Sequence, residues 1–336
     1  MISTSQPDPT KPGPTTVGQL GEHQVIRQII ERLGAAEGRS TYPVVIGPGD
    51  DTAMVAVPDG GALLTTDVLV DHVHFRRDWS TAYDVGRKAA AQSLADIAAM
   101  GGKATAIVVG LACPPDLPVS WVLGLADGLR EECEVVGATV VGGDVVRGDA
   151  VVVSVTALGE LAGGEAVRRA GAQVGDLLAV RGRLGWAAAG LAVLSRGFRS
   201  PKVLADAHRR PEPPYDAGPE AAKAGASAMC DVSDGLVADL GHVARASGVS
   251  ISIDVGAFEI ADPLRDAAAA LGVDPLMWVL TGGEDHALAA TWPPDARLPR
   301  GWLQCGEVVA AGPDGPSVLV NGEPFEGAGG WDHFSG

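Results

Sequence analysis

Short runs rich in Val, Leu and Ala alternate along this chain with longer segments whose apolar residues recur at helical spacing. Such alternation predicts mixed α/β units, in which helices pack on sheets. Gly163-Gly164 and the segment Arg168-Arg169-Ala170-Gly171 interrupt it, and it resumes beyond them. The 336 residues also exceed the usual size of one domain, about 100–200 residues. We therefore predict two α/β domains, over residues 19–162 and 163–336.

The local pattern predicts individual elements. Strands are expected near residues 44–46, 53–57, 62–69, 104–112, 139–141, 151–161, 177–181, 228–231, 250–254, 285–291, 302–309 and 317–320. Helices are expected over residues 22–33, 81–100, 119–136, 186–196, 219–223, 235–246 and 264–271. Ser80 is the expected N-cap of the long Ala-rich helix, and Gly101-Gly102 its stop.

The first 18 residues are rich in Pro, Ser, Thr and Gly and lack the apolar stretch of a signal peptide. We interpret residues 1–18 as a disordered tail. No apolar run approaches the ~20 residues of a membrane helix. The four cysteines form no C-x-x-C motif, which favours free thiols in a reducing compartment. We therefore expect a cytoplasmic protein without a membrane segment.

The formal net charge is −17, and only five lysines occur in the chain. Nucleic-acid binding draws its affinity from Lys and Arg on phosphates, so this balance argues against a nucleic-acid partner. It argues equally against docking on anionic lipid. A solubility role is the default explanation of the acidic charge, but the positions of the acids suggest a further one.

Acidic residues recur where predicted strands end and glycines cluster. They lie in Gly49-Asp50-Asp51, Thr65-Thr66-Asp67, Gly142-Gly143-Asp144, Asp231-Val232-Ser233-Asp234-Gly235 and Gly282-Gly283-Glu284-Asp285, and Asp96 stands in the Ala-rich helix. Each has a plain structural explanation, because Asp and Gly are common turn formers and helix caps. Asp67 is the exception, since a carboxylate in an apolar strand costs free energy unless it is paired or bound to metal.

Taken together, the acids indicate a cation site. Mg²⁺ prefers carboxylate oxygens and usually shares its coordination shell with substrate phosphates. A site rich in carboxylates and poor in lysine repels a polyphosphate, unless metal ions bridge the two. The chain contains no G-x-x-x-x-G-K-[ST] loop, no G-x-S-x-G elbow and no H-E-x-x-H motif.

The ordered set of these motifs resembles bacterial thiamine-monophosphate kinases, in the superfamily of aminoimidazole ribonucleotide synthetase. The resemblance runs from about Gly21 to Phe334. Besides the acidic motifs above, it rests on residues 71–75 (DHVHF), 94–101 (LADIAAMG) and 330–334 (GWDHF). One G-G-D would mean little, but all the motifs in order form a specific signal.

The resemblance implies a fold and roles for individual residues. Two α/β domains are expected, with N-terminal domains pairing in a homodimer to form a shared β-barrel beside the nucleotide site. The implied Mg²⁺ ligands around the ATP phosphates are Asp50, Thr65, Thr66, Asp67, Asp96, Asp144, Asp231 and Asp234. The implied ATP contacts are Gly143, Asp144, Arg169 and Ser233, and the thiamine-phosphate pocket is implied at His74, Glu284 and Trp331. A cationic thiazolium suits a carboxylate and an aromatic face.

The implied reaction is ATP-dependent phosphorylation of thiamine monophosphate to thiamine diphosphate, a step of thiamine biosynthesis that needs several Mg²⁺ ions. The nucleophile is an oxygen of the substrate's own phosphate, which is largely ionised at neutral pH. Neither a catalytic base nor a side-chain nucleophile is therefore expected, and catalysis becomes positioning plus charge neutralisation in a direct in-line transfer.

Four positions depart from the family pattern. His286 stands where Tyr is common, Val136 where an aromatic residue is common, Ser93 where Asn is frequent, and Asp71 replaces Glu. None of them removes an implied metal ligand.

Two alternatives stay open at this stage. One is another ATP-using enzyme of the superfamily, such as a selenophosphate synthetase or the hydrogenase-maturation dehydratase. The former usually needs a reactive residue near its N-terminus and the latter a C-terminal Cys, whereas this chain has no Cys before Cys113 and ends in Ser335-Gly336. The other is a non-catalytic nucleotide or metal sensor built on the same fold.

Overall fold

The computed structural model describes residues 15–20, 28–29, 31–32, 44–46, 54–55, 62–161 and 164–331. Within the helix expected over 22–33, the described residues 28–29 and 31–32 are helical. Strands β1 (Val44–Ile46) and β2 (Met54–Val55) pair antiparallel. Asp50 and residues 332–336 lie outside the described residues.

The end of the predicted tail is part of the structure. Helix α1 (Val17–Leu20) includes two of its residues. Thr16 forms an isolated bridge with Pro118, and the Val17 amide donates to the Leu117 carbonyl at 2.9 Å. Residues 15–18 therefore pack on the rest of the chain, contrary to the prediction of a disordered segment, and residues 1–14 lie outside the described ranges.

A four-stranded sheet forms the first half of the described chain. Its strands are β3 (Leu63–Val70), β6 (Val152–Glu160), β4 (Lys103–Cys113) and β5 (Thr139–Arg147), in that spatial order. β6 pairs antiparallel with β3 and β4, whereas β4 and β5 are parallel. The parallel pair is joined by helix α4 (Val119–Val136), as a crossover connection requires.

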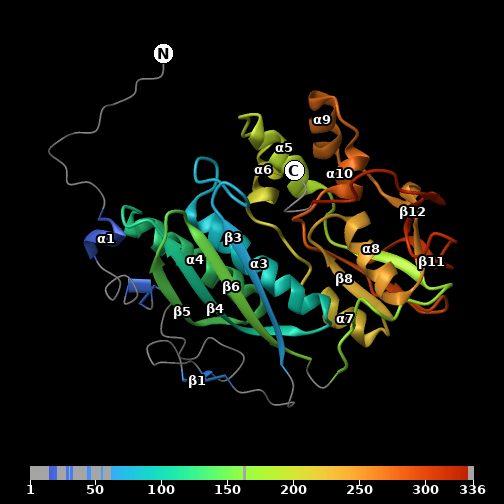
Figure 1. Ribbon diagram of the computed structural model, residues 1–336, viewed down its shortest axis with the longest axis horizontal. Helices are drawn as coiled ribbons and strands as arrows, with labels where there is room; N and C mark the ends of the chain where they lie inside the picture. Colours follow the sequence, from blue (N-terminus) through green and yellow to red (C-terminus); the bar gives the residue numbers. More distant parts are fainter. Residues whose placement is uncertain are drawn as a thin grey trace.

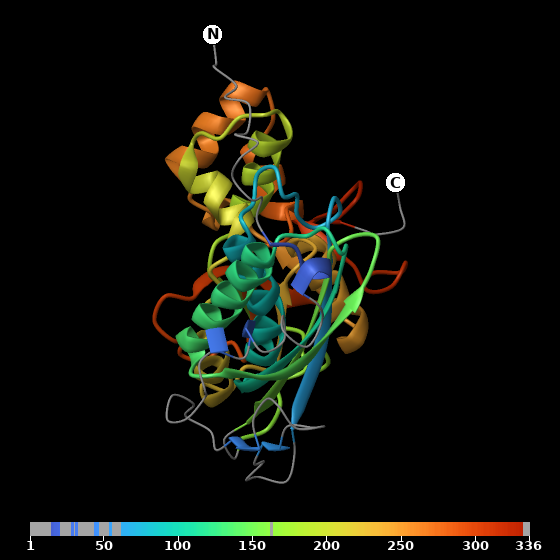
Figure 2. The same cartoon turned by 90° about the vertical axis from the view of Figure 1, so that its left-hand side faces the viewer.

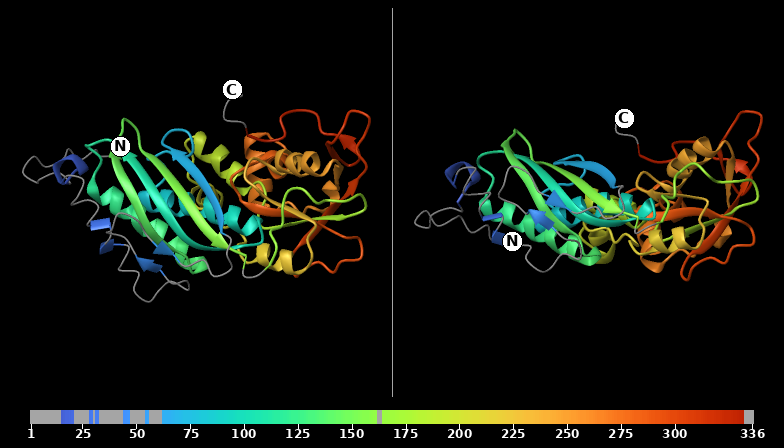
Figure 3. Two further views of the ribbon diagram at one scale, coloured as in Figure 1. Left: turned by 60° about the horizontal axis from the view of Figure 1, so that its bottom comes forward. Right: turned by 90° about the horizontal axis from the view of Figure 1, so that it is seen from below.

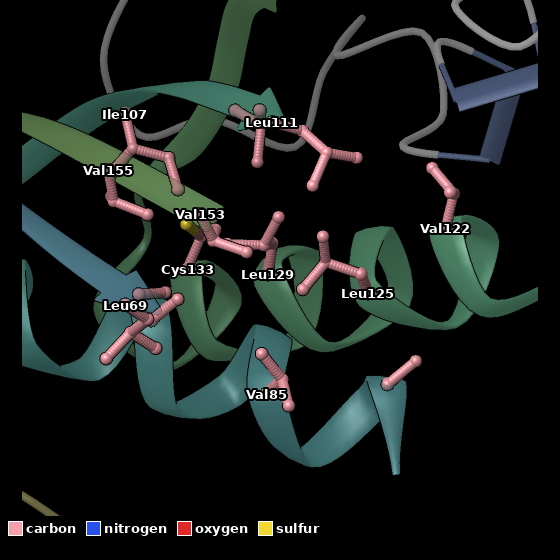
Figure 4. Close-up of a cluster of buried hydrophobic side chains, with 14 of the residues drawn as sticks. Leu69, Val85, Ile107, Leu111, Val122, Leu125, Leu129, Cys133, Val153 and Val155 are labelled. Atoms are coloured by element: carbon pink, nitrogen blue, oxygen red, sulfur yellow. The ribbon is translucent and has the colours of Figure 1, made fainter. Parts of the chain in front are cut away.

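Helices α3 (Ala82–Ala99) and α4 cover one face of this sheet (Figure 2). Side chains from alternate strand positions meet the helices in one apolar cluster, in which Leu69, Ile107, Val153, Val155 and Leu129 are all at most 4% exposed (Figure 4). Full burial of each such side chain stabilises the fold by about 1.5–3 kcal/mol. The cluster fixes which face of each strand points inward, because a one-residue slip would expose it.

The two helices cross at a pair of glycines. A Cβ on Gly86 would lie 2.2 Å from the Leu125 carbonyl oxygen, and one on Gly128 would lie 2.2 Å from the Tyr83 carbonyl oxygen. Only glycine permits this approach of two backbones. The Ala-rich composition of α3 serves the same close packing.

Helix α3 begins one residue later than predicted. Its N-cap is Thr81, not Ser80. The Thr81 hydroxyl accepts from the Asp84 amide at 3.2 Å, and the Asp84 carboxylate accepts from the Thr81 amide at 2.9 Å. This reciprocal pair is a capping box, which satisfies two backbone donors at once.

The opposite face of the four-stranded sheet carries exposed apolar side chains. Leu64, which is 70% exposed, lies there with Val68, Val108 and Val146. Asp144 pairs in register with Gly110 and so points to this same face, which we call the open face. The described strands of the sheet do not close into a barrel within one chain.

A seven-stranded mixed sheet forms the second half. Its spatial order is β13 (Glu323–Pro324), β12 (Val318–Val320), β9 (Ser250–Ile253), β11 (Leu303–Val309), β7 (Leu177–Arg181), β10 (Ala287–Trp292) and β8 (Ala228–Val232). Only the β12–β9 pair is parallel. β8 and β10 are buried at every position, which accounts for their mainly apolar sequences.

The helices of this half are α5 (Trp186–Ser195), α6 (Lys202–Arg209), α7 (Ala217–Lys223), α8 (Leu236–Ser247), α9 (Asp262–Leu271) and α10 (Pro275–Thr281), with a 3₁₀ turn at Val255–Ala257. The sequence pattern did not predict α6 or α10. Both are short, with 8 and 7 residues. Pro201 is the N-cap of α6, and Pro275 is the first residue of α10.

The mixed α/β architecture expected from the alternation is confirmed. The two sheets lie at opposite ends of the molecule (Figure 3), and α3 runs between them, contacting β3 on one side and β8 and α7 on the other (Figure 1). Among the described helices, none combines the length and apolar character needed to cross a bilayer.

Candidate active site

A cavity of about 930 Å³ opens between the two halves of the chain. The N-terminal half contributes β3, the turn after it and the middle of α3, and the C-terminal half contributes α5, α6 and two glycine-containing loops. Of the sequence-predicted site residues, Thr66, Asp67, His74, Asp96, Ser233, Asp234, Glu284 and Trp331 line this cavity.

Asp67 points from β3 towards α3, where it meets a serine. The Ser93 hydroxyl, which is fully buried, donates to Asp67 Oδ2 at 2.6 Å. Burial raises the pKa of Asp67, and the hydrogen bond from Ser93 lowers it only in part. Thr66, its neighbour on β3, points to the opposite side, where its hydroxyl accepts from that of Thr156 at 3.0 Å.

Asp96 lies on α3 beside the same strand. Its Oδ2 accepts a 2.6 Å hydrogen bond from the Thr65 hydroxyl. Burial raises the pKa of Asp96 to about 7, and the charges of Asp231 and Asp67 add to the increase. Carboxylates that repel one another in this way gain stability from a bound cation.

Asp231 lies near the end of β8, and its charge acts on Asp96 together with that of Asp67. It is 3% exposed, and its Oδ2 lies 3.0 Å from His286 Nδ1. His286 is also buried and has a positive φ of 51°. Burial opposes protonation of His286, but the hydrogen bond and charge of Asp231 outweigh it and raise the pKa of the imidazole. His286 thus supplies a buried polar partner for Asp231.

Ser233 and Asp234 form the turn between β8 and α8. The Asp239 carboxylate accepts from the amides of Asp234 and Gly235, both at 3.0 Å. Burial, followed by the charge of Asp231, raises the pKa of Asp239 to about 7. Gly235 has a φ of 139°, a conformation that L side chains rarely adopt. The turn therefore presents Ser233 and Asp234 to the cavity in a fixed orientation.

Glu284 lies across the cavity, in the loop between α10 and β10. Its Oε2 accepts from Lys88 Nζ at 2.8 Å, and His208 Nδ1 lies 3.4 Å from the same oxygen. Burial alone would raise the pKa of Glu284, but the attraction of Lys88 outweighs it, and the pKa falls to about 2. Burial, then the charge of Lys88, lowers the pKa of His208 to about 3, so this imidazole is neutral.

His74 and Trp331 lie near the mouth of the cavity. His74 Nδ1 accepts from the Val70 amide at 3.0 Å, which holds the ring at the end of β3. The Trp331 amide donates to the Asp234 carbonyl at 3.0 Å, and its side chain is 60% exposed. An exposed aromatic face is thus tied to the turn that carries Asp234.

Three predicted residues lie away from this cavity. Gly143 and Asp144 are exposed on β5, the edge strand three positions from β3 in the sheet. Since adjacent strands are about 4.8 Å apart, Asp144 lies on the order of 14 Å from the matching position of β3. Arg169 is exposed in the segment before β7. Asp50 lies outside the described residues.

Sequence reasoning missed Lys88, Gln92 and His208, although all three line or support the cavity. A signal was present for two of them. Lys88, Gln92 and Asp96 recur every four residues in an otherwise Ala-rich helix, which places them on one face. His208 lay in a helix that the pattern did not predict.

The donor set of the cavity fits Mg²⁺. Its carboxylates and threonine hydroxyls are the hard oxygen ligands that this ion prefers. Among the described residues, no group of three His, Cys, Asp or Glu side chains is close enough to hold a metal by itself. That spacing suits an ion that takes one or two carboxylates and completes its shell with water and phosphate oxygens.

Comparison with known proteins defines the class of this two-domain fold. The family model "AIR synthase related protein, N-terminal domain" matches residues 49–161, and "AIR synthase related protein, C-terminal domain" matches residues 173–296. The chain is thus a two-domain protein of the aminoimidazole ribonucleotide synthetase type.

Its relatives narrow the class further. The chain is 48% identical over 321 residues to a thiamine-monophosphate kinase of Mycobacterium tuberculosis, covering 95% of this chain and 93% of that protein. A relative of the same name from Corynebacterium glutamicum is 41% identical over 316 residues and covered to 91%, as is this chain. The solved structure "AaThiL complexed with AMPPCP and TMP" superposes with a TM-score of 0.76 at 32% identity, covering 96% of this chain and all of that one. The chain belongs to the thiamine-monophosphate kinase family.

Proposed function

We infer that this protein transfers the terminal phosphoryl group of ATP to thiamine monophosphate, giving thiamine diphosphate and ADP. The observation that carries this inference is the meeting of carboxylates from both halves of the chain at one cavity. Asp67 and Asp96 come from the N-terminal half and Asp234 from the C-terminal half, and the charge of the buried Asp231 raises the pKa of Asp96. A relative solved with AMPPCP and TMP supports the same pair of substrates.

Unsatisfied polar atoms support a ligand in the cavity. Trp79 Nε1, Gln92 Oε1 and His286 Nε2 belong to lining residues, are buried, and have no hydrogen-bond partner among the described residues. Buried polar groups in proteins are nearly always paired. A polar substrate that rearranges these side chains would satisfy them.

Magnesium is the ion that the donor set favours. Asp67, Asp96, Asp231 and Asp234 would hold it, with Thr65 and Thr66 beside them, and Asp50 is proposed as a further ligand. When bound, Mg²⁺ would neutralise phosphate charge that these carboxylates would otherwise repel. Gly143, Asp144, Arg169 and Ser233 remain proposals for contacts on the ATP side, with Asp144 a further proposed ligand.

The side chains of this site bind and orient rather than attack. An oxygen of thiamine monophosphate is the nucleophile, and it is already ionised for the most part at neutral pH. Orientation across the cavity then supplies most of the rate increase, as in other phosphoryl transfers. We propose a direct in-line transfer. A chiral γ-phosphate should therefore be inverted in the product, and retention would contradict a single transfer.

The deciding experiment incubates purified protein with thiamine monophosphate and Mg-ATP and separates the thiamine phosphates by chromatography. Equal amounts of thiamine diphosphate and ADP are expected, with loss of both on chelation or in Asp67→Asn. The control Asp116→Asn changes an exposed carboxylate outside the cavity and should retain activity. ATP binding without product would favour the sensor function instead.

The open face suggests a homodimer. Its exposed Leu64, Val68, Val108 and Val146 form an apolar surface on the mixed four-stranded sheet. Exposed apolar patches of this kind commonly mark protein contacts. We propose that the open faces of two chains pack together into a shared β-barrel, as expected for this family.

The cellular location is also a proposal. All four cysteines are buried and free, which suits the reducing cytoplasm. The division of the chain between residues 162 and 163 likewise remains a prediction, and residues 162–163 lie outside the described ranges.

A further inference from the structure

A buried lysine connects the two sides of the substrate cavity. Lys88, on α3, is 2% exposed, and its ammonium group donates to the His74 carbonyl at 2.9 Å and to Glu284 Oε2 at 2.8 Å. His74 follows β3 in the N-terminal half, whereas Glu284 lies in the loop before β10 in the C-terminal half. One cation therefore joins two of the three residues for which the family resemblance implies a thiamine-phosphate pocket.

This contact changes the electrostatic character of Glu284. A buried ammonium ion is tolerated only when it is paired and hydrogen-bonded. Glu284 is the acidic partner of Lys88, and the nearby His208 is neutral. The carboxylate is thus ionised, but its charge is offset at 2.8 Å by a lysine. A substrate approaching Glu284 meets a compensated pair and not a free anion.

The pair also fixes the position of the carboxylate. Glu284 has a φ of 67°, a backbone conformation uncommon for a residue with a side chain. Its amide donates to the Ser233 carbonyl at 2.7 Å, which anchors the backbone while Lys88 anchors the side chain. Because Lys88 and His208 both approach Oε2, Oε1 is the oxygen that the described residues leave to accept a hydrogen bond from a ligand.

We propose that Lys88 is a positioning residue, which holds Glu284 as a hydrogen-bond acceptor for an N–H group of the substrate and cancels its attraction for the substrate's cation. The acceptor would suit an aminopyrimidine, whose exocyclic amine is a neutral donor. This inference rests on the proposed function. It differs from the charge pairing between Glu284 and thiazolium that the sequence suggested.

The test compares thiamine monophosphate with an analogue in which a neutral thiophene replaces the thiazolium and the aminopyrimidine is unchanged. Binding is measured by calorimetry without ATP, and kcat and KM by product formation. Glu284→Gln should weaken binding of both ligands by the same factor, at least tenfold. Loss confined to the cationic ligand would overturn the proposal.

The two explanations predict opposite effects of Lys88→Met on the affinity for thiamine monophosphate. If Lys88 positions Glu284, the variant should raise the KM for thiamine monophosphate at least tenfold and change kcat little. If Glu284 recognises charge, removal of the lysine frees its anion, and the cationic substrate should bind more tightly than to the wild type. Tighter binding would refute the positioning role.

Controls separate folding and function from the inference. Lys103→Met removes an exposed lysine at the start of β4, outside the cavity, and should leave all constants unchanged. The double variant Lys88→Met/Glu284→Gln buries no unpaired charge, and it should fold but bind no better than Glu284→Gln. If Lys88→Met does not fold, the inference is tested by the double variant and by the binding of both ligands to Glu284→Gln. Wild-type protein that forms no thiamine diphosphate would instead refute the proposed function.

Discussion

Ser93 and Asp67 form a 2.6 Å hydrogen bond beneath the substrate cavity, and the serine has no exposed surface. Burial raises the pKa of Asp67, and the hydrogen bond from Ser93 is the largest influence that lowers it again. Ser93 therefore supplies Asp67 with a hydrogen-bond donor from α3.

Ser93→Ala should weaken metal binding without abolishing the fold. Asp67 would lose its donor, and its pKa would rise further, so protons would compete better with Mg²⁺. A hydrogen bond to a charged group contributes about 1.5–3 kcal/mol, and 1.4 kcal/mol corresponds to tenfold. The Mg²⁺ concentration for half-maximal activity should therefore rise about tenfold or more in an activity titration.

Thr105→Val is the matched control for this prediction. It removes a buried hydroxyl that donates to the Leu158 carbonyl at 3.1 Å and touches no carboxylate. Its magnesium requirement should equal that of the wild type. An unchanged requirement in Ser93→Ala would show that Ser93 does not tune Asp67.

Asp96→Asn should stabilise the protein in the absence of metal while it removes activity. Because the folded-state pKa of Asp96 is raised from 3.8 to about 7, its contribution to stability is present below 3.8 and is lost as the pH rises through 7. Metal-free Asp96→Asn should thus melt above the wild type at pH 8, by about 2–4 °C for each kcal/mol. The difference should vanish at pH 4.

Calorimetric melting with and without Mg²⁺ measures this effect. Mg²⁺ should stabilise the wild type and have little influence on Asp96→Asn. The exposed Asp116→Asn serves as the control for loss of one negative charge. A metal-free Asp96→Asn that is less stable than the wild type at pH 8 would mean that the carboxylate is not repelled by its neighbours.

The sequence predicted the long elements better than the short ones. The bounds predicted for α4 coincide with the structure, since 18 residues provide several turns of periodic pattern. Strand β5 extends to Arg147, beyond the predicted 139–141, because Gly142 and Gly143 were interpreted as a turn although they pair with β4. Thr81 with Asp84 three residues later was a recognisable cap, and the neighbouring Ser80 obscured it.

Site residues could be predicted from the sequence where their side chain does not suit the element that carries it. Asp67 was identifiable because an acid in an apolar strand needs a partner, and the structure gives it Ser93. Lys88 could not be assigned in the same way, since its partner Glu284 is 196 positions away and only the packing of α3 on the second half brings them together. Local sequence patterns cannot predict the contacts between the two halves of the chain, although these contacts are part of the site.

His208→Gln should reduce the loss of unfolding free energy that the wild type shows as the pH falls below 6.5. Burial, followed by the charge of Lys88, lowers the folded-state pKa of His208 from 6.5 to about 3. A depressed histidine pKa contributes stability that is present above 6.5 and lost as the pH falls towards 3. Urea unfolding of the wild type should lose about 2 kcal/mol from this group between pH 6.5 and 5.

His208→Gln should not show this acid-dependent loss of stability. The control His72→Gln, which changes an exposed histidine, should show it as the wild type does. The comparison is made at fixed ionic strength, so that general charge repulsion is equal in all proteins. Parallel profiles of His208→Gln and the wild type would show that folding does not lower the pKa of His208.

Gly128→Ala should destabilise the N-terminal half. Its Cβ would lie 2.2 Å from the Tyr83 carbonyl oxygen and 2.8 Å from the Arg87 amide nitrogen, both parts of the α3 backbone. Helix α3 would have to move away from α4, at a cost of about 1–3 kcal/mol or more. Gly241→Ala in α8 meets only the end of the Arg245 side chain, at 3.2 Å, and should be neutral or stabilising by up to about 1 kcal/mol.

Urea unfolding of the two glycine variants decides the point. A Gly128→Ala protein as stable as Gly241→Ala would mean that α3 and α4 can separate without loss of core packing. Because α3 also carries Lys88 and Asp96, the Gly128→Ala variant should lose activity together with stability.

Charge on the open face should dissociate the proposed dimer. A standard interface buries about 1,200–2,000 Å², and a carboxylate placed in its apolar centre is left without a partner. The wild type should sediment at twice the 34.1 kDa mass of the chain. Val68→Glu/Val108→Glu, on β3 and β4, should sediment as a monomer at the same concentration, because both side chains point to the open face.

Val135→Glu on α4 is the matched control, since Val135 is 61% exposed but lies on the helical side of the sheet. This variant should remain dimeric. Circular dichroism shows whether the open-face variant is folded, which separates dissociation from unfolding. A wild-type chain that sediments as a monomer over the working range would remove the shared barrel, and the exposed valines and leucine would then need another covering partner.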